Sequence, residues 1–137
     1  TELMLDAFQY DLNRLHFTGP LPYVDYQRVL QASTVHTYLT YPYILSWSMI
    51  EAMSCGCALV ASDTPPVREV VEDEHNGLLV DFFSPQALAD KIERALDDAK
   101  LRRRLGAAAR QTALDRYDMD KLMPQHYQLL AQYARCK

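Results

Sequence analysis

Short apolar runs alternate along this chain with segments in which apolar residues recur at helical spacing. Residues 35–39 are rich in β-branched and aromatic side chains and predict a strand. Residues 58–61 form an unbroken apolar run, which is typical of a strand covered on both faces. Residues 15–18, closed by a Gly-Pro turn, and residues 78–80, preceded by an Asn-Gly turn, predict two more strands.

Helical patterns fill the intervals between these runs. We expect helices over residues 23–32, 46–55, 65–71 and 85–96, followed by two more helices after residue 100. Short strands separated by helices imply right-handed crossovers and a parallel sheet. The predicted fold class is therefore α/β, an open parallel sheet with helices on both faces and a helical C-terminal tail, in a single domain spanning residues 1–137.

Composition and charge narrow the possible functions. The 137 residues are 49% hydrophobic and 23% charged, which excludes disordered and fibrous proteins. Residues 1–90 carry three Lys or Arg against twelve Asp or Glu, a net charge of −9, whereas residues 91–137 carry eleven against six, a net charge of +5. An acidic first part argues against a nucleic-acid groove, because neutralising phosphates takes clustered Lys and Arg.

Cysteine and targeting signals are weak. The Cys55-Gly56-Cys57 spacing is one residue too short for a zinc knuckle, so we expect small buried thiols in a reducing, cytoplasmic compartment and no metal site. No apolar run approaches the ~20 residues of a membrane span. The start at Thr1 has no signal-peptide pattern, and we expect the chain to be a piece of a longer protein.

In open α/β sheets, ligands bind where the strands end and loops lead into helices. Three loops qualify, at residues 18–22, 40–48 and 62–67. None of them carries a dinucleotide fingerprint, a phosphate loop, a zincin helix or a hydrolase elbow. The corresponding classes of enzyme are disfavoured.

Glu51 is the most informative residue, since it is a single carboxylate on an otherwise apolar helix and is costly to bury without a partner. Two readings stay open. Ser48 and Glu51 fit a capping box, in which the carboxylate returns to the Ser48 backbone N–H. Alternatively, Glu51 accepts hydrogen bonds from a ligand diol. Likewise, Trp47 is either a core residue or part of a helix N-terminus that binds phosphate.

Five fragments in order carry a resemblance to a known family. They are Phe17-Thr18-Gly19 with Leu21, Val35-His36-Thr37-Tyr38, the stretch from Glu51-Ala52-Met53 to Ser62-Asp63, Pro66-Val67-Arg68-Glu69-Val70-Val71, and Asn76-Gly77-Leu78-Leu79-Val80. Over residues 13–125 the chain resembles the C-terminal, donor-binding domain of GT-B glycosyltransferases of family 4, the group 1 transferases.

The resemblance implies a nucleotide-diphosphate sugar as donor, transfer with retention at the anomeric carbon, and no obligatory metal or cofactor. Glu51 matches the family's second glutamate, which holds the donor ribose hydroxyls, and Gly19–Leu21 match the nucleobase pocket. The first glutamate of the family is replaced by Tyr43, and Ser46 stands where glycine is common in the loop whose amides face the diphosphate. The residues expected to bind the donor are Gly19, Pro20, Leu21, Tyr43, Leu45, Ser46, Trp47, Ser48 and Glu51.

The resulting prediction is the donor-binding half of a retaining, metal-independent glycosyltransferase, with no catalytic base assigned. The acceptor, a glycan, lipid or small molecule, would bind a missing N-terminal domain. We expect the first strands of the present domain to be missing as well, and the isolated chain to be inactive. The arginines Arg102–Arg104 and Arg110 have two readings, a peripheral contact with anionic lipid or a solvated helix face. The alternative function is a non-catalytic α/β binding or interaction module.

Overall fold

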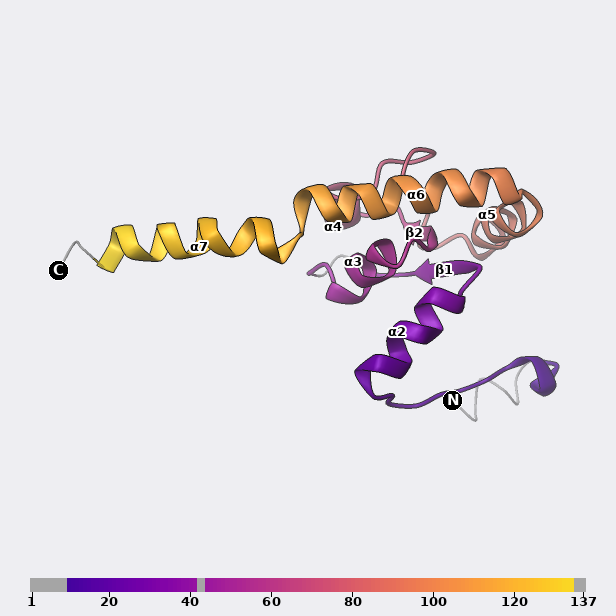
Figure 1. Ribbon diagram of the computed structural model, residues 1–137. Coiled ribbons are helices and arrows are strands. Elements are labelled where there is room, and N and C mark those ends of the chain that lie inside the picture. Colours follow the sequence, from indigo (N-terminus) through magenta and orange to yellow (C-terminus); the bar gives the residue numbers. More distant parts are fainter. Residues whose placement is uncertain (1–9, 42–43, 135–137) are drawn as a thin grey trace.

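The sheet has three parallel strands in the order β1-β2-β3 (Figure 1). The computed structural model describes residues 10–41 and 44–134. The strands are β1 (Val35–Tyr38), β2 (Ala58–Ser62) and β3 (Leu78–Val80). Val35 pairs with Ala58, and Val60 pairs with Leu78, so the central strand is bonded on both sides.

Seven helical segments accompany the strands in the described residues. They are η1 (Leu12–Arg14), α2 (Tyr23–Ala32), α3 (Trp47–Ser54), α4 (Pro65–Arg68), α5 (Pro85–Asp97), α6 (Ala99–Arg116) and α7 (Met119–Ala134). The expected helices over 23–32, 46–55 and 85–96 and the two after residue 100 are confirmed. Ser84 caps α5 as its sequence predicts, because its hydroxyl accepts the backbone N–H of Ala87.

Two expected elements are corrected. Residues 15–18 form no strand: they are exposed and irregular, and β-propensity without a neighbouring strand does not stabilise one. Helix α4 ends at Arg68 rather than near residue 71. It ends early because the Asn76 side-chain amide donates to the Val70 carbonyl at 3.0 Å, which turns the chain toward β3.

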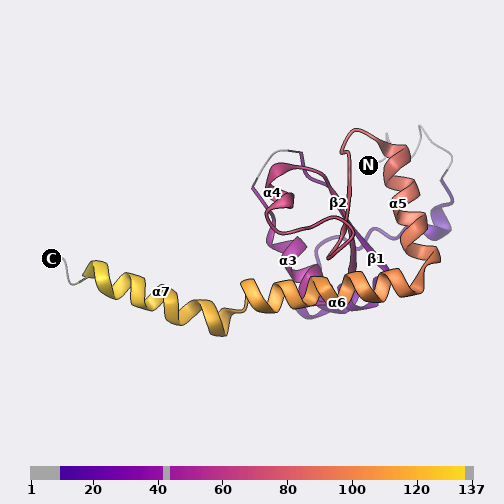
Figure 2. The same cartoon turned by 90° about the horizontal axis from the view of Figure 1, so that it is seen from above.

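Helices cover both faces of the sheet, as the fold class predicts (Figure 2). Leu59 and Ala61 of β2 pack with α3 and the second half of α6, whereas Val60 packs with α5 and the first half of α6. All five residues of β2 are buried, which explains the unbroken apolar run.

Helix α2 packs against the last turn of α3 and the residue before β2 through a small cluster of its own. Leu30 packs there with Ala52 and Cys57, and the Cys57 thiol donates to the Leu30 carbonyl at 3.1 Å. The expected burial of the thiols is correct for Cys57, whereas Cys55 is half-buried and Cys136 lies outside the described residues.

Four arginines of α6 bind backbone carbonyls of other segments. Arg110 donates to the Ser54 carbonyl at the end of α3, and Arg102 donates to two carbonyls in the last turn of α5. Arg116 donates to the Glu69 carbonyl at 3.0 Å, and Arg104 donates to that of Glu74. These cations therefore satisfy carbonyls left open at turns and helix ends.

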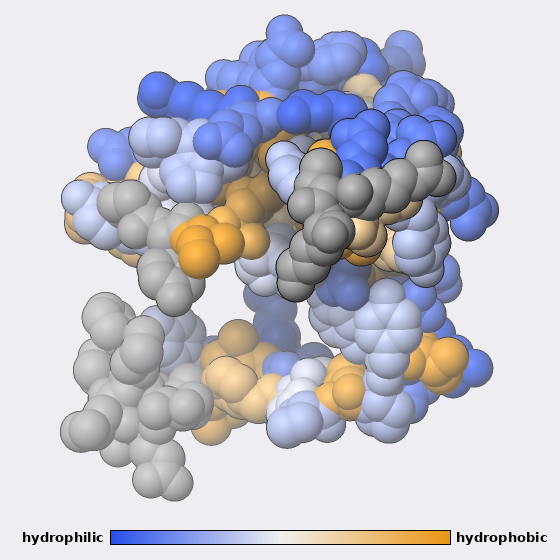
Figure 3. Space-filling model, turned by 90° about the vertical axis from the view of Figure 1, so that its left-hand side faces the viewer, coloured by the Kyte–Doolittle hydropathy of each residue, from blue (hydrophilic) through white to orange (hydrophobic). Residues whose placement is uncertain are grey.

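The two ends of the described chain extend from this body. Helix α7 continues the line of α6 away from the sheet and has no buried residue (Figures 1 and 2). On the other side, residues 10–22 run along an exposed path below the sheet, and Figure 3 shows open space between this segment and the rest of the molecule.

The contact of α3 with α6 predicts the effect of one added methyl group. A Cβ at Gly106 would clash with the carbonyl oxygen of Gly56. We expect Gly106→Ala to destabilise the protein by about 1–3 kcal/mol, since this overpacking exceeds the gain of ~1 kcal/mol in helix propensity. Urea unfolding measures the difference. Ala107→Ser, at the adjacent exposed position, is the control and should change stability by less than about 0.5 kcal/mol. A Gly106→Ala protein as stable as the wild type would contradict this packing.

Candidate functional site

The start of α3 is held by the hydroxyl of Tyr38, the last residue of β1. Ser46 is the N-cap residue; its backbone N–H donates to the Tyr38 hydroxyl at 2.9 Å, and its own hydroxyl accepts the Ser48 backbone N–H at 3.3 Å. The hydroxyls of Ser46 and Ser48 lie 2.9 Å apart. The first amides of α3 therefore begin at the carboxyl end of β1, where the topology predicts a ligand site.

A small cavity of about 160 Å³ adjoins this helix start. It is lined by Leu45, Ser46, Trp47, Ile50 and Tyr117. Three of the expected site residues thus share one cavity. The core-packing reading of Trp47 is wrong, because its side chain is 74% exposed.

A second cavity, of about 380 Å³, lies where the segment before α2 passes β1. Its lining residues come from three segments, namely Thr18, Gly19, Leu21, Tyr26, Val29, Leu30, Ser33 and His36. Gly19 adopts a positive φ of 61°, which glycine tolerates without strain, and Pro20 beside it is exposed. Burial lowers the pKa of His36, so its imidazole is neutral at pH 7 and able both to donate and to accept.

Glu51 does not form the capping box. The helix begins at Ser46, and the Ser48 backbone N–H donates to the Ser46 hydroxyl instead of to Glu51. Within the described part of the chain, the Glu51 carboxylate therefore does not receive the Ser48 backbone N–H that the motif requires. The capping-box reading is therefore wrong, because the N-cap residue is Ser46, two residues before Ser48, and its hydroxyl accepts the Ser48 backbone N–H.

The Glu51 carboxylate acts electrostatically on two tyrosines of α2. The carboxylate, as a hydrogen-bond acceptor and as a negative charge, raises the pKa of Tyr23. Burial, together with the same carboxylate, raises the pKa of Tyr26 to about 12. The rings of Tyr23 and Tyr26 lie 6.2 Å apart. Sequence reasoning missed both tyrosines, although their i,i+3 spacing places them on one face of α2.

Tyr26 lies between two groups of expected site residues, those in the cavity before α2 and those on α3. It lines the cavity that contains Gly19 and Leu21, and it interacts with Glu51, which shares α3 with the helix start at Ser46. Tyr43 lies outside the described residues. The loops after β1 and β3 meet in space, since the Tyr41 ring lies 5.3 Å and 4.9 Å from those of Phe82 and Phe83.

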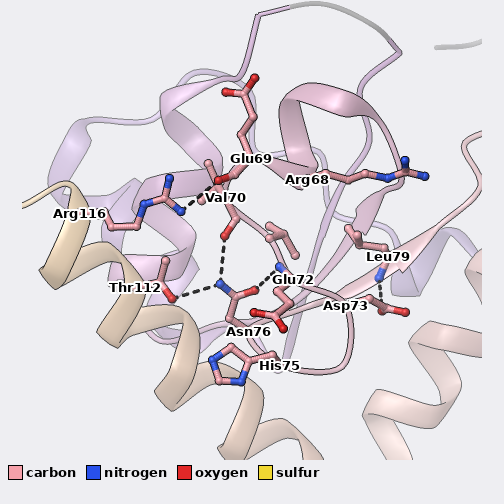
Figure 4. A pocket seen from close by; sticks show the side chains of 11 residues that line it. Arg68, Glu69, Val70, Glu72, Asp73, His75, Asn76, Leu79, Thr112 and Arg116 are labelled. Carbon is pink, nitrogen blue, oxygen red and sulfur yellow. Dashed lines mark hydrogen bonds between the residues drawn. The ribbon is translucent and has the colours of Figure 1, made fainter.

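A third cavity, of about 550 Å³, contains none of the expected site residues (Figure 4). It lies between the segment after α4 and helix α6, and Asn76 closes it by hydrogen bonds to Val70, Glu72 and Thr112. Arg116 donates to the Glu69 carbonyl at the same place. Because these polar groups satisfy one another, the cavity is a structural joint and not the candidate site.

Metal-ligand clusters and membrane-spanning helices were sought in residues 10–41 and 44–134. No group of three His, Cys, Asp or Glu side chains there is placed to hold a metal ion. No helix in that part of the chain is both long and apolar enough to cross a bilayer.

The sequence matches a known family over most of its length. The family described as Glycosyl transferases group 1 matches residues 2–112. The chain belongs to this family. It is 29% identical over 88% of its length to an uncharacterised glycosyltransferase of Methanocaldococcus jannaschii. It is 32% identical over 82% of its length to an N,N'-diacetylbacillosaminyl-diphospho-undecaprenol alpha-1,3-N-acetylgalactosaminyltransferase of Campylobacter jejuni. It covers 31% and 29% of these two proteins, so it spans about a third of their length.

Solved structures show the same fold. Sucrose-phosphate synthase of Thermosynechococcus elongatus superposes with a TM-score of 0.87 at 25% identity, covering 99% of this chain and 34% of that one. HepE of Anabaena in complex with UDP-glucose superposes with a TM-score of 0.86 at 23% identity, covering 96% and 35%. The chain therefore has the Rossmann-like architecture of a partial, C-terminal-like GT-B domain, as expected from its sequence.

The contact with Glu51 predicts how the two tyrosines titrate. Tyr26 should remain protonated at pH 11, because burial and the nearby carboxylate raise its pKa to about 12. Between pH 10 and 12 the unfolded chain loses this proton and the folded chain keeps it, so folding stability falls as pH rises. Glu51→Gln should lower the pKa of both tyrosines. Carbon-13 NMR of protein with labelled tyrosine Cζ follows each ring, and a Tyr26 that titrates near 10 would contradict the contact.

Proposed function

We propose that this chain binds the nucleotide-diphosphate sugar donor of a glycosyltransferase and supplies the donor-binding half of its active site. One observation carries the proposal: Glu51, the residue that matches the family's ribose-binding glutamate, is not taken up by the cap of α3. A carboxylate on the second turn of an apolar helix needs hydrogen-bond donors, and the ribose diol supplies them. Each such charge-assisted bond contributes about 1.5–3 kcal/mol.

The diphosphate is proposed to lie at the start of α3. The first backbone N–H groups of the helix have no acceptor within it, and the helix dipole places partial positive charge there. Cations contribute little from this part of the chain, since Arg28 pairs with Asp25 and Arg68 pairs with Asp63. The net charge of −9 over residues 1–90 agrees with a site whose Arg and Lys come from upstream, as the family resemblance implies.

The nucleobase is proposed to occupy the cavity that contains Gly19 and Leu21. Its neutral, half-buried imidazole at His36 and its apolar wall of Leu21, Val29 and Leu30 suit an uncharged planar ring. The solved complexes of HepE with UDP-glucose and with UDP support a nucleotide sugar as the ligand class. The base, the sugar and the acceptor are not assigned.

The chemistry is proposed to be transfer with retention, without a metal ion, with the departing phosphate assisting deprotonation of the acceptor. The acceptor, a glycan, lipid or small molecule, would bind a separate N-terminal domain, and α7 with its exposed apolar side chains would pack back against that domain. We propose that the enzyme is cytoplasmic, that it contacts a membrane peripherally, and that the isolated chain transfers no sugar.

A second candidate is a non-catalytic α/β binding or interaction module. Tyr43, in place of the family's first glutamate, favours it, because a tyrosine offers one hydroxyl where a carboxylate would hold the sugar end of the donor. Calorimetry with UDP- and GDP-sugars, on this chain and on its full-length parent, separates the two. Absence of binding to every nucleotide sugar by both proteins would overturn the transferase proposal.

The role of Glu51 predicts a separation of binding from stability. Glu51→Gln should weaken UDP or GDP binding about tenfold or more, because a neutral amide replaces an ionised acceptor. The melting temperature should change little, since the carboxylate closes no helix cap. Isothermal titration calorimetry and thermal unfolding of the same samples measure both quantities.

Glu93→Gln is the matched control, because Glu93 is an exposed glutamate on α5 far along the chain from the site. It should change neither quantity. A Glu51→Gln protein that melts several degrees lower and binds nucleotide as the wild type does would assign Glu51 a structural role.

A further inference from the structure

The Tyr26 hydroxyl is buried and forms no hydrogen bond within the described residues. Such a group costs folding free energy, because water leaves it and nothing in the protein replaces the lost hydrogen bond. A buried hydroxyl without a partner is explained if it gains a hydrogen bond when a ligand binds, either from the ligand or from a side chain that rearranges.

Packing fixes where this hydroxyl lies. The Tyr26 ring of α2 packs on the cluster of Leu30, Ala52 and Cys57, so it is held against the last turn of α3. Ala52 is the residue next to Glu51 on α3. The same ring lines the cavity that contains Gly19. Tyr26 thus stands between the proposed base cavity and the proposed ribose-binding carboxylate.

We propose that Tyr26 is a positioning residue for Glu51: on nucleotide binding its hydroxyl donates to one carboxylate oxygen, which leaves the other oxygen directed at the ribose hydroxyls. This inference rests on the proposed function and deepens it. A carboxylate has two oxygens with about four acceptor positions, so one donor from the protein and a diol from the ligand can be accommodated together. Because packing holds the donor in place, the hydrogen bond limits the orientations of the carboxylate, and less conformational entropy is lost when the ligand binds.

Tyr26 suits this role better than its neighbour Tyr23. The Tyr23 side chain is 59% exposed, so water competes with Glu51 for its hydroxyl. Tyr26 is shielded, and its pKa of about 12, raised by burial and by the Glu51 carboxylate, keeps it a protonated donor at every pH at which the protein would work.

The test compares ribose with deoxyribose nucleotides. Calorimetry of the wild type with UDP and GDP, and with their 2′-deoxy counterparts, measures how much the protein gains from the 2′-hydroxyl. For whichever of UDP and GDP binds more tightly, we expect the 2′-deoxy form to bind about tenfold more weakly than the ribose form. In Tyr26→Phe the ratio should fall to about threefold or less, with the affinity for the deoxy form nearly unchanged, and in Glu51→Gln the ratio should approach one.

Tyr127→Phe removes an exposed hydroxyl from α7 and is the matched control; its ratio should equal that of the wild type. If Tyr26→Phe weakens ribose and deoxyribose forms equally, or changes neither, the positioning role is overturned while the proposed function stands. If neither this chain nor its full-length parent binds any nucleotide sugar, the proposed function fails and this inference fails with it; if only the parent binds, the same variants are compared in the parent. Thermal unfolding of each variant verifies that the proteins compared are folded.

Discussion

Burial of β2 on both faces is the constraint on which the rest of the structure depends. Its side chains alternate between two clusters, with Leu59 and Ala61 against α3 and Val60 against α5, and helix α6 crosses both. Because a parallel strand needs both faces covered, the flanking helices are obligatory. They bring the loops after the strands to one edge of the sheet. There Ser62 binds both the N–H and the carbonyl of Thr40, which ties the end of β2 to the loop that leads into α3.

The same packing sets the electrostatics of the candidate site. Helix α3 buries Met49, Ile50 and Met53, and this leaves Glu51 on the side that meets α2. There the carboxylate raises the pKa of Tyr23 and Tyr26, whose neutral hydroxyls can donate to a carboxylate without neutralising it. An ion pair with Arg or Lys would hold the carboxylate more strongly and would compete with a neutral diol for its oxygens. A weakly held acceptor beside a cavity is an arrangement suited to binding hydroxyl groups.

Most of the fold was predictable because its signals are local. The caps Ser46 and Ser84, the prolines at the start of α4 and α5, and the apolar run of β2 each act within one or two turns of their own position. Residues 15–18 have the same kind of strand signal and yet form no strand, since a strand also requires a partner. Trp47 shows the converse limit: its large apolar ring predicts burial, but the residue is 74% exposed and lines a cavity.

The sequence by itself determined most of the elements, the parallel sheet and the family, because hydrophobic period, capping residues and motif spacing are properties of consecutive residues. The placement of most expected ligand residues near strand ends followed from that order. Only the tertiary structure decided what surrounds Glu51. The Ser46 hydroxyl and the Glu51 carboxylate are alternative acceptors for the Ser48 backbone N–H, and the structure gives it to Ser46, whose own backbone N–H donates to the Tyr38 hydroxyl of β1. The approach of Tyr26 is likewise a contact between two helices whose relative position is fixed by packing, which no local pattern encodes.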